Sequence, residues 1–505
     1  MRVIFVLFDS LNRGILESYG SELMQTPNFK RLAERALTFD NHYVGSLPCM
    51  PARRDLQSGR LSFLHRSWGP MEPFDNSLPE ILKQKSVYTH LITDHYHYFE
   101  DGGATYHTRF NSYEFVRGQE GDRWKAMVQP PWQRLREMYH PSQYDERPGS
   151  LPYHYMVNRE YMRREEDFPS VNCFRLAEEF IETNKAADNW FLQLETFDPH
   201  EPFHAPQRLR EKLKTDYKGP IRDWPPYSRV TEHKEECDEL RANYMALVAL
   251  CDEQIGKLID KMDALDMWKD TMLVVTTDHG YLLGEHDWWA KNRMHAYQEI
   301  VHIPLFVHHP DYPKNIGLRR KALTQTADLM PTFLDAFGIG VPEGVTAKSM
   351  MPLLGAENAR FREALVYGYF GAAINVTDGR YAYFRYPRNL RDQPLYEYTL
   401  MPNHMLGSFT EAEIKTVAIE PGRPFSRGMP TLKIAAVPGS PWYESHGPAR
   451  MVDCETVLFD LAADPEQVAP IRDADIERRL LQQILSCFAE LDAPPEAYER
   501  FRLAP

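Results

Sequence analysis

The chain has 505 residues, of which 43% are hydrophobic and 26% are charged, a composition typical of globular proteins. Its length exceeds one ordinary hydrophobic core and predicts a large domain with a smaller one beside it. The formal net charge of −14 disfavours nucleic acid or an anionic membrane as a partner, because both bind basic surfaces. An anionic small molecule stays compatible if positive side chains gather in one cleft.

The N-terminal apolar run, residues 3–8, is the first predicted element, a strand buried on both faces. It is too short for a signal peptide or a membrane span, so the default expectation for the compartment is cytoplasmic. The six cysteines show neither metal-ligand spacing nor a disulfide framework. They occupy positions 49, 173, 237, 251, 454 and 487, and the second, third and fourth lie in helical patterns.

Strands and helices then alternate along the chain. Further buried strands are predicted over residues 87–93, 190–194, 272–277 and 303–307. Helices are predicted to start with Thr26 as cap and near Asn172, to cover residues 55–64, and to run from about 236 to 265. This alternation predicts an α/β fold with a doubly wound, mostly parallel sheet and helices on both faces.

The remaining segments suggest a division of the chain. Residues 95–167 are irregular and rich in Tyr, His, Trp, Arg and Gly, which predicts an insertion over the functional face of a domain spanning 1–355. In the expected C-terminal domain, 356–505, apolar runs at 364–370, 373–376 and 381–386 predict a smaller antiparallel sheet. A closing helix is expected over about 476–491.

Polar residues follow four of the predicted strands. They are Asp9, the set Asp94, His95, Tyr96 and His97, then His200, and finally Asp278 with His279. Because the carboxyl ends of parallel strands share one edge of the sheet, we expect these side chains to meet there and bind a ligand. Any one of them alone would be better interpreted as a structural residue, such as a helix cap.

The segment that begins at Cys49 reads Cys-x-Pro-x-Arg and continues to Gly59-Arg60. A lone cysteine is usually a small buried side chain. Together with Phe8-Asp9-Ser10, Asp198-Pro199-His200, Asp278-His279-Gly280 and Lys291, however, the segment resembles the signature of type I, formylglycine-dependent sulfatases. This resemblance places the chain in the alkaline phosphatase superfamily, close to arylsulfatases and phosphonate monoester hydrolases, and implies an alkaline-phosphatase-like fold.

The resemblance also implies a cofactor set. A formylglycine-generating enzyme would oxidise Cys49 to Cα-formylglycine during maturation, and the hydrated aldehyde would be the nucleophile. Asp9, oxidised Cys49, Asp278 and His279 would hold one divalent metal ion. Carboxylate oxygens favour Ca²⁺, while the imidazole leaves Mn²⁺, Zn²⁺ or Mg²⁺ open.

Catalytic roles follow from the same resemblance. Arg53 would brace the developing anion. His200 and Lys291 would bind the sulfate and protonate the leaving group, and His95 or His97 would act as the base. Asp94 and Tyr96 are expected to bind substrate with His200 and Lys291, although which residue of 94–97 touches it stays open.

Two departures from the sulfatase pattern widen the function. Ser10 stands where many sulfatases have a second Asp, and residues 94–97 replace a Lys-x-His pair. Both changes resemble phosphonate monoester hydrolases and phosphodiesterases, which form the alternative to a sulfate ester hydrolase. A phosphatase with a Ser or Thr nucleophile is disfavoured, because Ser46 and Ser58 lack the flanking pattern.

The aromatic and imidazole side chains beyond Thr93 suggest a small monosulfated or monophosphonated ester with a neutral ring as substrate. A non-catalytic binding protein that retains the fold is disfavoured, because most of the expected catalytic residue types are present. Whether the chain forms a homo-oligomer is left open.

Overall fold

The computed structural model describes residues 1–357, 361–391, 394–440, 450–452 and 455–503, so Cys454 lies outside the described residues. Its largest sheet has eight strands in the order β12-β2-β11-β8-β1-β7-β5-β6. The central strand β1 (Arg2–Phe8) is parallel to β7 (Trp190–Thr196) and to β8 (Thr271–Thr277).

On one side the parallel part continues through β5 (Tyr88–Thr93) and β6 (Ser112–Phe115). On the other side β11 (Leu305–His308) runs antiparallel to β8, followed by β2 (Leu37–Phe39) and β12 (Arg319–Arg320). The predicted doubly wound, mostly parallel sheet is confirmed.

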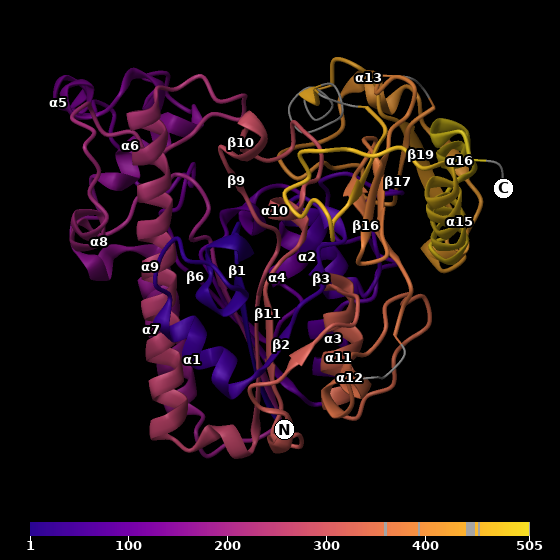
Figure 1. Ribbon diagram of the computed structural model, residues 1–505, viewed down its shortest axis with the longest axis horizontal. Helices are drawn as coiled ribbons and strands as arrows, with labels where there is room; N and C mark the ends of the chain where they lie inside the picture. Colours follow the sequence, from indigo (N-terminus) through magenta and orange to yellow (C-terminus); the bar gives the residue numbers. More distant parts are fainter. Residues whose placement is uncertain (358–360, 392–393, 441–449, 453–454, 504–505) are drawn as a thin grey trace.

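Both faces of this sheet are covered, and the alternation of side chains along β1 shows how (Figure 1). Even-numbered residues such as Ile4 and Val6 pack with α1 (Pro27–Arg35), α7 (Pro169–Thr183) and α9 (Lys234–Ala264). Odd-numbered residues pack on the opposite face with α3 (Leu78–Gln84), α11 (Leu329–Ala336) and α12 (Met351–Gly355). A strand buried on both faces is expected to be apolar, as β1 is from Val3 to Phe8.

Helix starts differ from the expectation in two places. The side chain of Thr26 does not cap α1; it accepts a hydrogen bond from the Glu17 amide, 3.0 Å away. The carboxylate of Asp252, on α9, instead accepts from the amides of Asn28 and Phe29 at 2.9 and 2.8 Å. The helix expected to be capped near Asn172 begins earlier, at Pro169, where proline suits the first turn.

The segment 95–167 is less irregular than its composition suggested. It contributes the edge strand β6 to the main sheet, and it holds α5 (Trp132–Met138) and α6 (Leu151–Arg159), which lie at the upper left in Figure 1. Apolar and aromatic side chains of this segment, among them Leu135, Tyr139 and Tyr155, form a small core of their own with Met156. None of the described helices is long and apolar enough to cross a membrane.

A second sheet of five strands has the order β20-β16-β15-β14-β4. Four strands come from the C-terminal part: β14 (Leu365–Tyr369), β15 (Ile374–Thr377), β16 (Tyr381–Arg385) and β20 (Val457–Asp460). These four pair with one another in antiparallel fashion, as expected. The closing helix α15 (Ala474–Glu490) packs on this sheet through Leu480, Ile484 and Phe488.

The fifth strand of the second sheet, β4 (Ser46–Leu47), comes from the N-terminal part of the chain. It pairs in parallel with β14, Ser46 opposite Gly368 and Leu47 opposite Tyr369. Helix α2 (Cys49–Ser58) follows after one residue, so the second sheet anchors the start of α2. The expected helix over 55–64 instead begins at Cys49 and ends at Ser58. It ends there because Gly59 adopts φ 67°, a left-handed conformation that favours glycine.

Candidate active site

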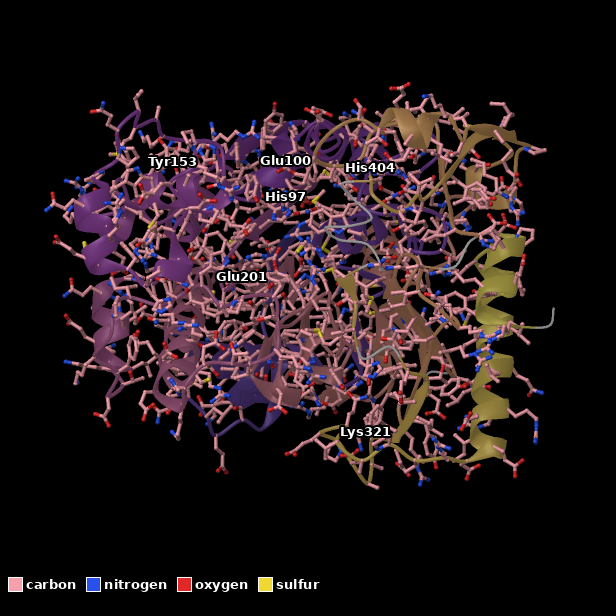
Figure 2. All side chains as sticks on the ribbon, turned by 90° about the horizontal axis from the view of Figure 1, so that it is seen from above. His97, Glu100, Tyr153, Glu201, Lys321 and His404 are labelled. Carbon is pink, nitrogen blue, oxygen red and sulfur yellow. The ribbon has the colours of Figure 1, made fainter. Side chains whose placement is uncertain are left out.

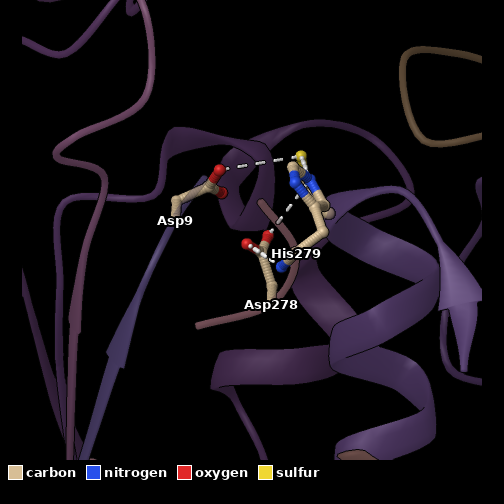
Figure 3. Close-up of side chains that lie close together, drawn as sticks. Asp9, Asp278 and His279 are labelled. Atoms are coloured by element: carbon tan, nitrogen blue, oxygen red, sulfur yellow. Dashed lines mark hydrogen bonds and ion pairs between the residues drawn. The ribbon is translucent and has the colours of Figure 1, made fainter. Parts of the chain in front are cut away.

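Three elements bring the expected metal ligands together. Asp9 follows β1 and Asp278 follows β8, and these strands are parallel and in register, with Phe8 opposite Thr277. Cys49 is the first residue of α2. One ligand atom from each of Asp9, Cys49, Asp278 and His279 lies within 4.8 Å of the others (Figure 3). The Cys49 sulfur is 3.2 Å from Nε2 of His279 and 4.0 Å from Oδ1 of Asp9.

This cluster fits a divalent cation. All four residues are buried, and Oδ2 of Asp9 has no hydrogen-bond partner among the described residues. Burial, and then the neighbouring Asp278 carboxylate, raise the pKa of Asp9 to about 8. A cation between the two carboxylates would remove that repulsion.

The imidazole of His279 is oriented for metal binding. Its Nδ1 is 2.8 Å from the carbonyl oxygen of Gly280, so Nε2 faces the cluster. Burial lowers the pKa of His279 to about 3, which keeps the ring neutral, the form that binds metals. Gly280 is required at the next position, because a Cβ there would lie 2.0 Å from the carbonyl oxygen of Glu299.

The guanidinium of Arg53 contacts carboxylates and does not line the cavity described below. Its nitrogens lie 3.2 Å from Asp9 Oδ2, 2.6 Å from Asp278 Oδ2 and 3.2 Å from Glu195 Oε2. The hydroxyl of Tyr98 also donates to Glu195, at 2.8 Å. Arg53 therefore positions the carboxylates of Asp9 and Asp278, and Glu195 with Tyr98 positions Arg53. Glu195 was not predicted as a site residue, because its only signal was its place near the end of a strand.

Ser10 forms hydrogen bonds with Asp9, Asp278 and Lys291, which its residue type alone did not indicate. Its amide donates to Asp278 Oδ1 at 3.1 Å and its hydroxyl to Asp9 Oδ1 at 2.8 Å. Lys291 Nζ donates to the same hydroxyl at 2.8 Å and lies 3.7 Å from the Cys49 sulfur. Ser10 has φ 62°, a backbone conformation that is uncommon outside glycine and concentrates at functional sites.

A cavity of about 630 Å³ opens from Cys49 to the surface. Cys49, His200 and Lys291 form its buried end. Nδ1 of His200 is 2.5 Å from the Glu201 carbonyl oxygen, which leaves Nε2 for the cavity. Burial, and then the charge of Lys291, lower the pKa of His200, so the ring is neutral.

The 94–97 segment divides between the cavity and the protein interior. Tyr96 and His97 line the cavity, and His97 Nδ1 lies 2.6 Å from Glu100 (Figure 2). Asp94 lies outside the lining, where its carboxylate accepts from the Phe197 amide at 2.7 Å and from Gln119 at 3.1 Å. His95 is also outside, 3.3 Å from the sulfur of Met50 and 3.8 Å from Asp9.

Several cavity residues were not predicted from the sequence. Glu120 accepts a hydrogen bond of 2.6 Å from the Tyr96 hydroxyl. It belongs to a Gly-rich turn of the insertion, and only that turn marked the region. Further aromatic or basic side chains line the cavity, namely Trp68, Arg123, His154, Arg222, Trp224, Tyr227, Arg293 and Arg450.

The fold and this site fit a hydrolytic enzyme of the alkaline phosphatase superfamily. A family model described as Sulfatase matches residues 2–339, and one described as N-sulphoglucosamine sulphohydrolase, C-terminal, matches residues 284–420. The first match covers more than half of the chain. The chain therefore belongs to the sulfatase family, and it is a hydrolase of sulfuric esters.

Curated relatives agree with this family. An N-acetylglucosamine-6-O-sulfatase of Bacteroides thetaiotaomicron is 25% identical over 430 residues, which cover 73% of this chain and 74% of the relative. A choline-sulfatase of Rhizobium meliloti is 23% identical over 416 residues, covering 75% and 77%.

Solved structures share the fold. A structure described as BT4656 in complex with its substrate D-glucosamine-2-N,6-O-disulfate has a TM-score of 0.67 at 16% identity and covers 98% of both chains. The phosphonate monoester hydrolase of Agrobacterium radiobacter has a TM-score of 0.64 at 17% identity and covers 97% of this chain and 95% of its own.

Proposed function

We propose that this enzyme hydrolyses a sulfate ester with a formylglycine made from Cys49 and one divalent metal ion held by Asp9, Asp278, His279 and residue 49. The observation that carries the proposal is the convergence of these four ligand atoms within 4.8 Å, with Cys49 at the buried end of a cavity. Ca²⁺ is the first candidate because two ligands are carboxylates; the imidazole keeps Mn²⁺, Zn²⁺ and Mg²⁺ as alternatives.

When bound, the metal would supply Lewis acidity and a fixed template for an anionic oxygen, and the oxidised side chain would supply the nucleophilic hydroxyl. Arg53 holds Asp9 and Asp278 in place for that task. Lys291 keeps a fixed positive charge beside residue 49, where an incoming sulfate would sit.

His200 and His97 are the two cavity imidazoles placed to move protons. In neutral His200 the Nδ1–H donates to the Glu201 carbonyl, so Nε2 faces the cavity as an acceptor and can donate to an ester oxygen only once the ring has taken up a proton. The Glu100 carboxylate raises the pKa of His97 against the opposing effect of burial, so His97 is the better proton acceptor. We therefore assign leaving-group contact to His200 and the base to His97 rather than His95.

A phosphonate monoester or phosphodiester is the alternative substrate class. Because Ser10 replaces a second carboxylate, the cluster has one negative charge fewer than the usual sulfatase pattern. Tetrahedral sulfuryl and phosphoryl groups offer similar oxygens to the same cations, so one site can serve both. The natural sulfate esters to try first are N-acetylglucosamine 6-sulfate and choline sulfate, the substrates for which two relatives are named.

The test is a comparison of kcat/KM for 4-nitrophenyl sulfate, a phenyl phosphonate monoester and a phosphodiester, with protein of known metal content. Peptide mass spectrometry of residue 49 is measured on the same sample, because formylglycine makes that peptide lighter than cysteine does. We expect the sulfate ester to be preferred. A preference for phosphorus by more than about tenfold, roughly 1.4 kcal/mol, would establish the alternative.

A further inference from the structure

The charge of the active-site cavity is opposite to the charge of the whole chain. The chain carries a formal charge of −14. Yet five cationic side chains line the cavity, from Lys291, Arg123, Arg222, Arg293 and Arg450, against two carboxylates, from Glu100 and Glu120. Lys291 is sufficient to bind one sulfate at the buried end, so one sulfate does not explain the presence of the four arginines.

The two carboxylates do not neutralise these arginines. Glu100 is held by His97 Nδ1 at 2.6 Å, and Glu120 by the Tyr96 hydroxyl at 2.6 Å. Burial, and then the charge of Glu201, raise the pKa of Glu120 to about 7, so near neutral pH this side chain carries a reduced negative charge.

The charge of Arg222 is compensated by two neighbouring glutamates. Its guanidinium lies 2.6 Å from Glu232 and 2.7 Å from Glu236. Arg123 and Arg450 are exposed and make neither an ion pair nor a hydrogen bond through their side chains within the ranges that the structure describes. They come from two distant parts of the chain, the insertion and the C-terminal part, and they line the same cavity.

The residues that line the cavity also differ in how exposed they are. Its buried end has Cys49, His200 and Lys291, while Trp224 and Tyr227 are half-buried. These aromatic faces suit a sugar or aryl ring. Arg123 and Arg450 are more exposed than these aromatic residues, and planar guanidinium groups can bind carboxylates and sulfates in a bidentate way.

From this arrangement we propose that the substrate carries a second anionic group, a sulfate or a carboxylate, which Arg123 and Arg450 bind at the open end of the cavity while the scissile sulfate lies beside residue 49. The inference rests on the proposed function. It replaces the expectation of a singly charged ester with a neutral ring by a dianionic one, such as a sulfated sugar with another acidic substituent.

Two matched pairs of substrates test the proposal. One pair tests a sulfate as the second anionic group, and the other tests a carboxylate. In the first, glucosamine-2-N,6-O-disulfate is compared with N-acetylglucosamine 6-sulfate, which has a neutral group on the same nitrogen. In the second, a uronate-linked N-acetylglucosamine 6-sulfate disaccharide is compared with its uronate methyl ester. The quantity measured is the ratio of kcat/KM within each pair, which cancels differences in enzyme loading.

We expect the wild-type enzyme to prefer the anionic member of at least one pair by about tenfold. Arg123→Gln and Arg450→Gln should each reduce this ratio severalfold, mainly through KM. Arg164→Gln is the matched control, because Arg164 is an exposed arginine of the same insertion that pairs with Glu166 and Asp167 and does not line the cavity. The control should retain the wild-type ratio.

A binding measurement separates this inference from the proposed function. Isothermal titration of the Cys49→Ala variant with the same two pairs reports affinity without turnover. If metal-loaded wild-type enzyme with formylglycine hydrolyses none of these sulfates, the proposed function fails while the titration still tests the second anion site. Equal affinities within both pairs, or ratios that neither arginine variant changes, would overturn the second site.

Discussion

Asp9 and Asp278 end two neighbouring parallel strands, and this register forces their carboxylates into one buried space. Arg53 contacts both carboxylates, and Lys291 lies 3.9 Å from Asp9. Each of these interactions is made away from water, where removing one partner leaves the other charge uncompensated. Substitutions here therefore act on charge balance before they act on packing.

The metal site gives the first prediction. Asp278→Ala removes one ligand carboxylate and leaves Arg53 without its shortest ion pair, so the variant should lose bound metal and reduce kcat/KM by about a thousandfold or more. Metal content per chain is measured by plasma mass spectrometry. Asp287→Ala, an exposed carboxylate on the following loop, should retain wild-type metal. One divalent ion per chain in Asp278→Ala would contradict the ligand assignment.

The nucleophile gives the second prediction. Cys49→Ala and Cys49→Ser should both abolish sulfate-ester hydrolysis, because neither side chain can become a hydrated aldehyde. The thermal midpoint should change little, since both replacements are small and residue 49 is the first residue of α2. Cys487→Ser, which changes a thiol of α15 away from the cavity, serves as the control for activity. Substantial turnover by Cys49→Ser would exclude the aldehyde.

At the scale of elements, the strands that precede Asp9 and Asp278 and the long helix α9 could be predicted from the sequence, because continuous apolar runs and a long amphipathic pattern leave few alternatives. Helix starts could not. The cap of α1 is the clearest case, because its acceptor, Asp252, is 224 residues from Asn28 in sequence. Only the packing of α9 against α1 brings this side chain to the helix N-terminus.

The cap leads to the third prediction. Asp252→Ala should lower the free energy of unfolding by about 1–3 kcal/mol, because it leaves one buried and one partly buried amide of α1 without an acceptor. Asp260→Ala is the control on the same helix: its exposed carboxylate pairs with Arg31, a kind of pair worth about 0–1 kcal/mol. Urea unfolding of the three proteins gives the comparison. Equal stabilities of the two variants would show that the cap contributes little.

At the scale of the whole molecule, the active site draws on segments that the sequence does not connect. Residues that follow strands were predictable as a group, because the carboxyl ends of parallel strands meet at one edge. Glu120, Arg123 and Arg450 were not, since they lie in an insertion and a C-terminal segment whose placement depends on tertiary packing. The domain boundary near residue 355 and the cytoplasmic location stay predictions.

The cavity's charge gives the fourth prediction. Glu120 is largely neutral below its raised pKa of about 7 and becomes negative above it, inside a cavity that accepts an anion. KM for a sulfate ester should therefore rise as the pH increases through about 7, and Glu120→Gln should flatten that rise. The measurement is KM between pH 5.5 and 8.5, expressed as the ratio of the two proteins, so that other titrating groups cancel. An identical rise in the variant would assign the effect elsewhere.

The pairing of β4 with β14 determines how late in synthesis the segment before Cys49 can reach its folded position. Ser46 lies opposite Gly368, 322 residues later in the chain, so ribosomes elongating at about 5–20 residues per second expose β4 roughly 16 to 64 seconds before its partner exists. In the folded protein Cys49 is only 2% exposed. A modifying enzyme would therefore convert this cysteine in the nascent or denatured chain and leave folded, unmodified protein unchanged. Slowing or hastening synthesis of the intervening segment would then set what fraction of the molecules ever becomes active.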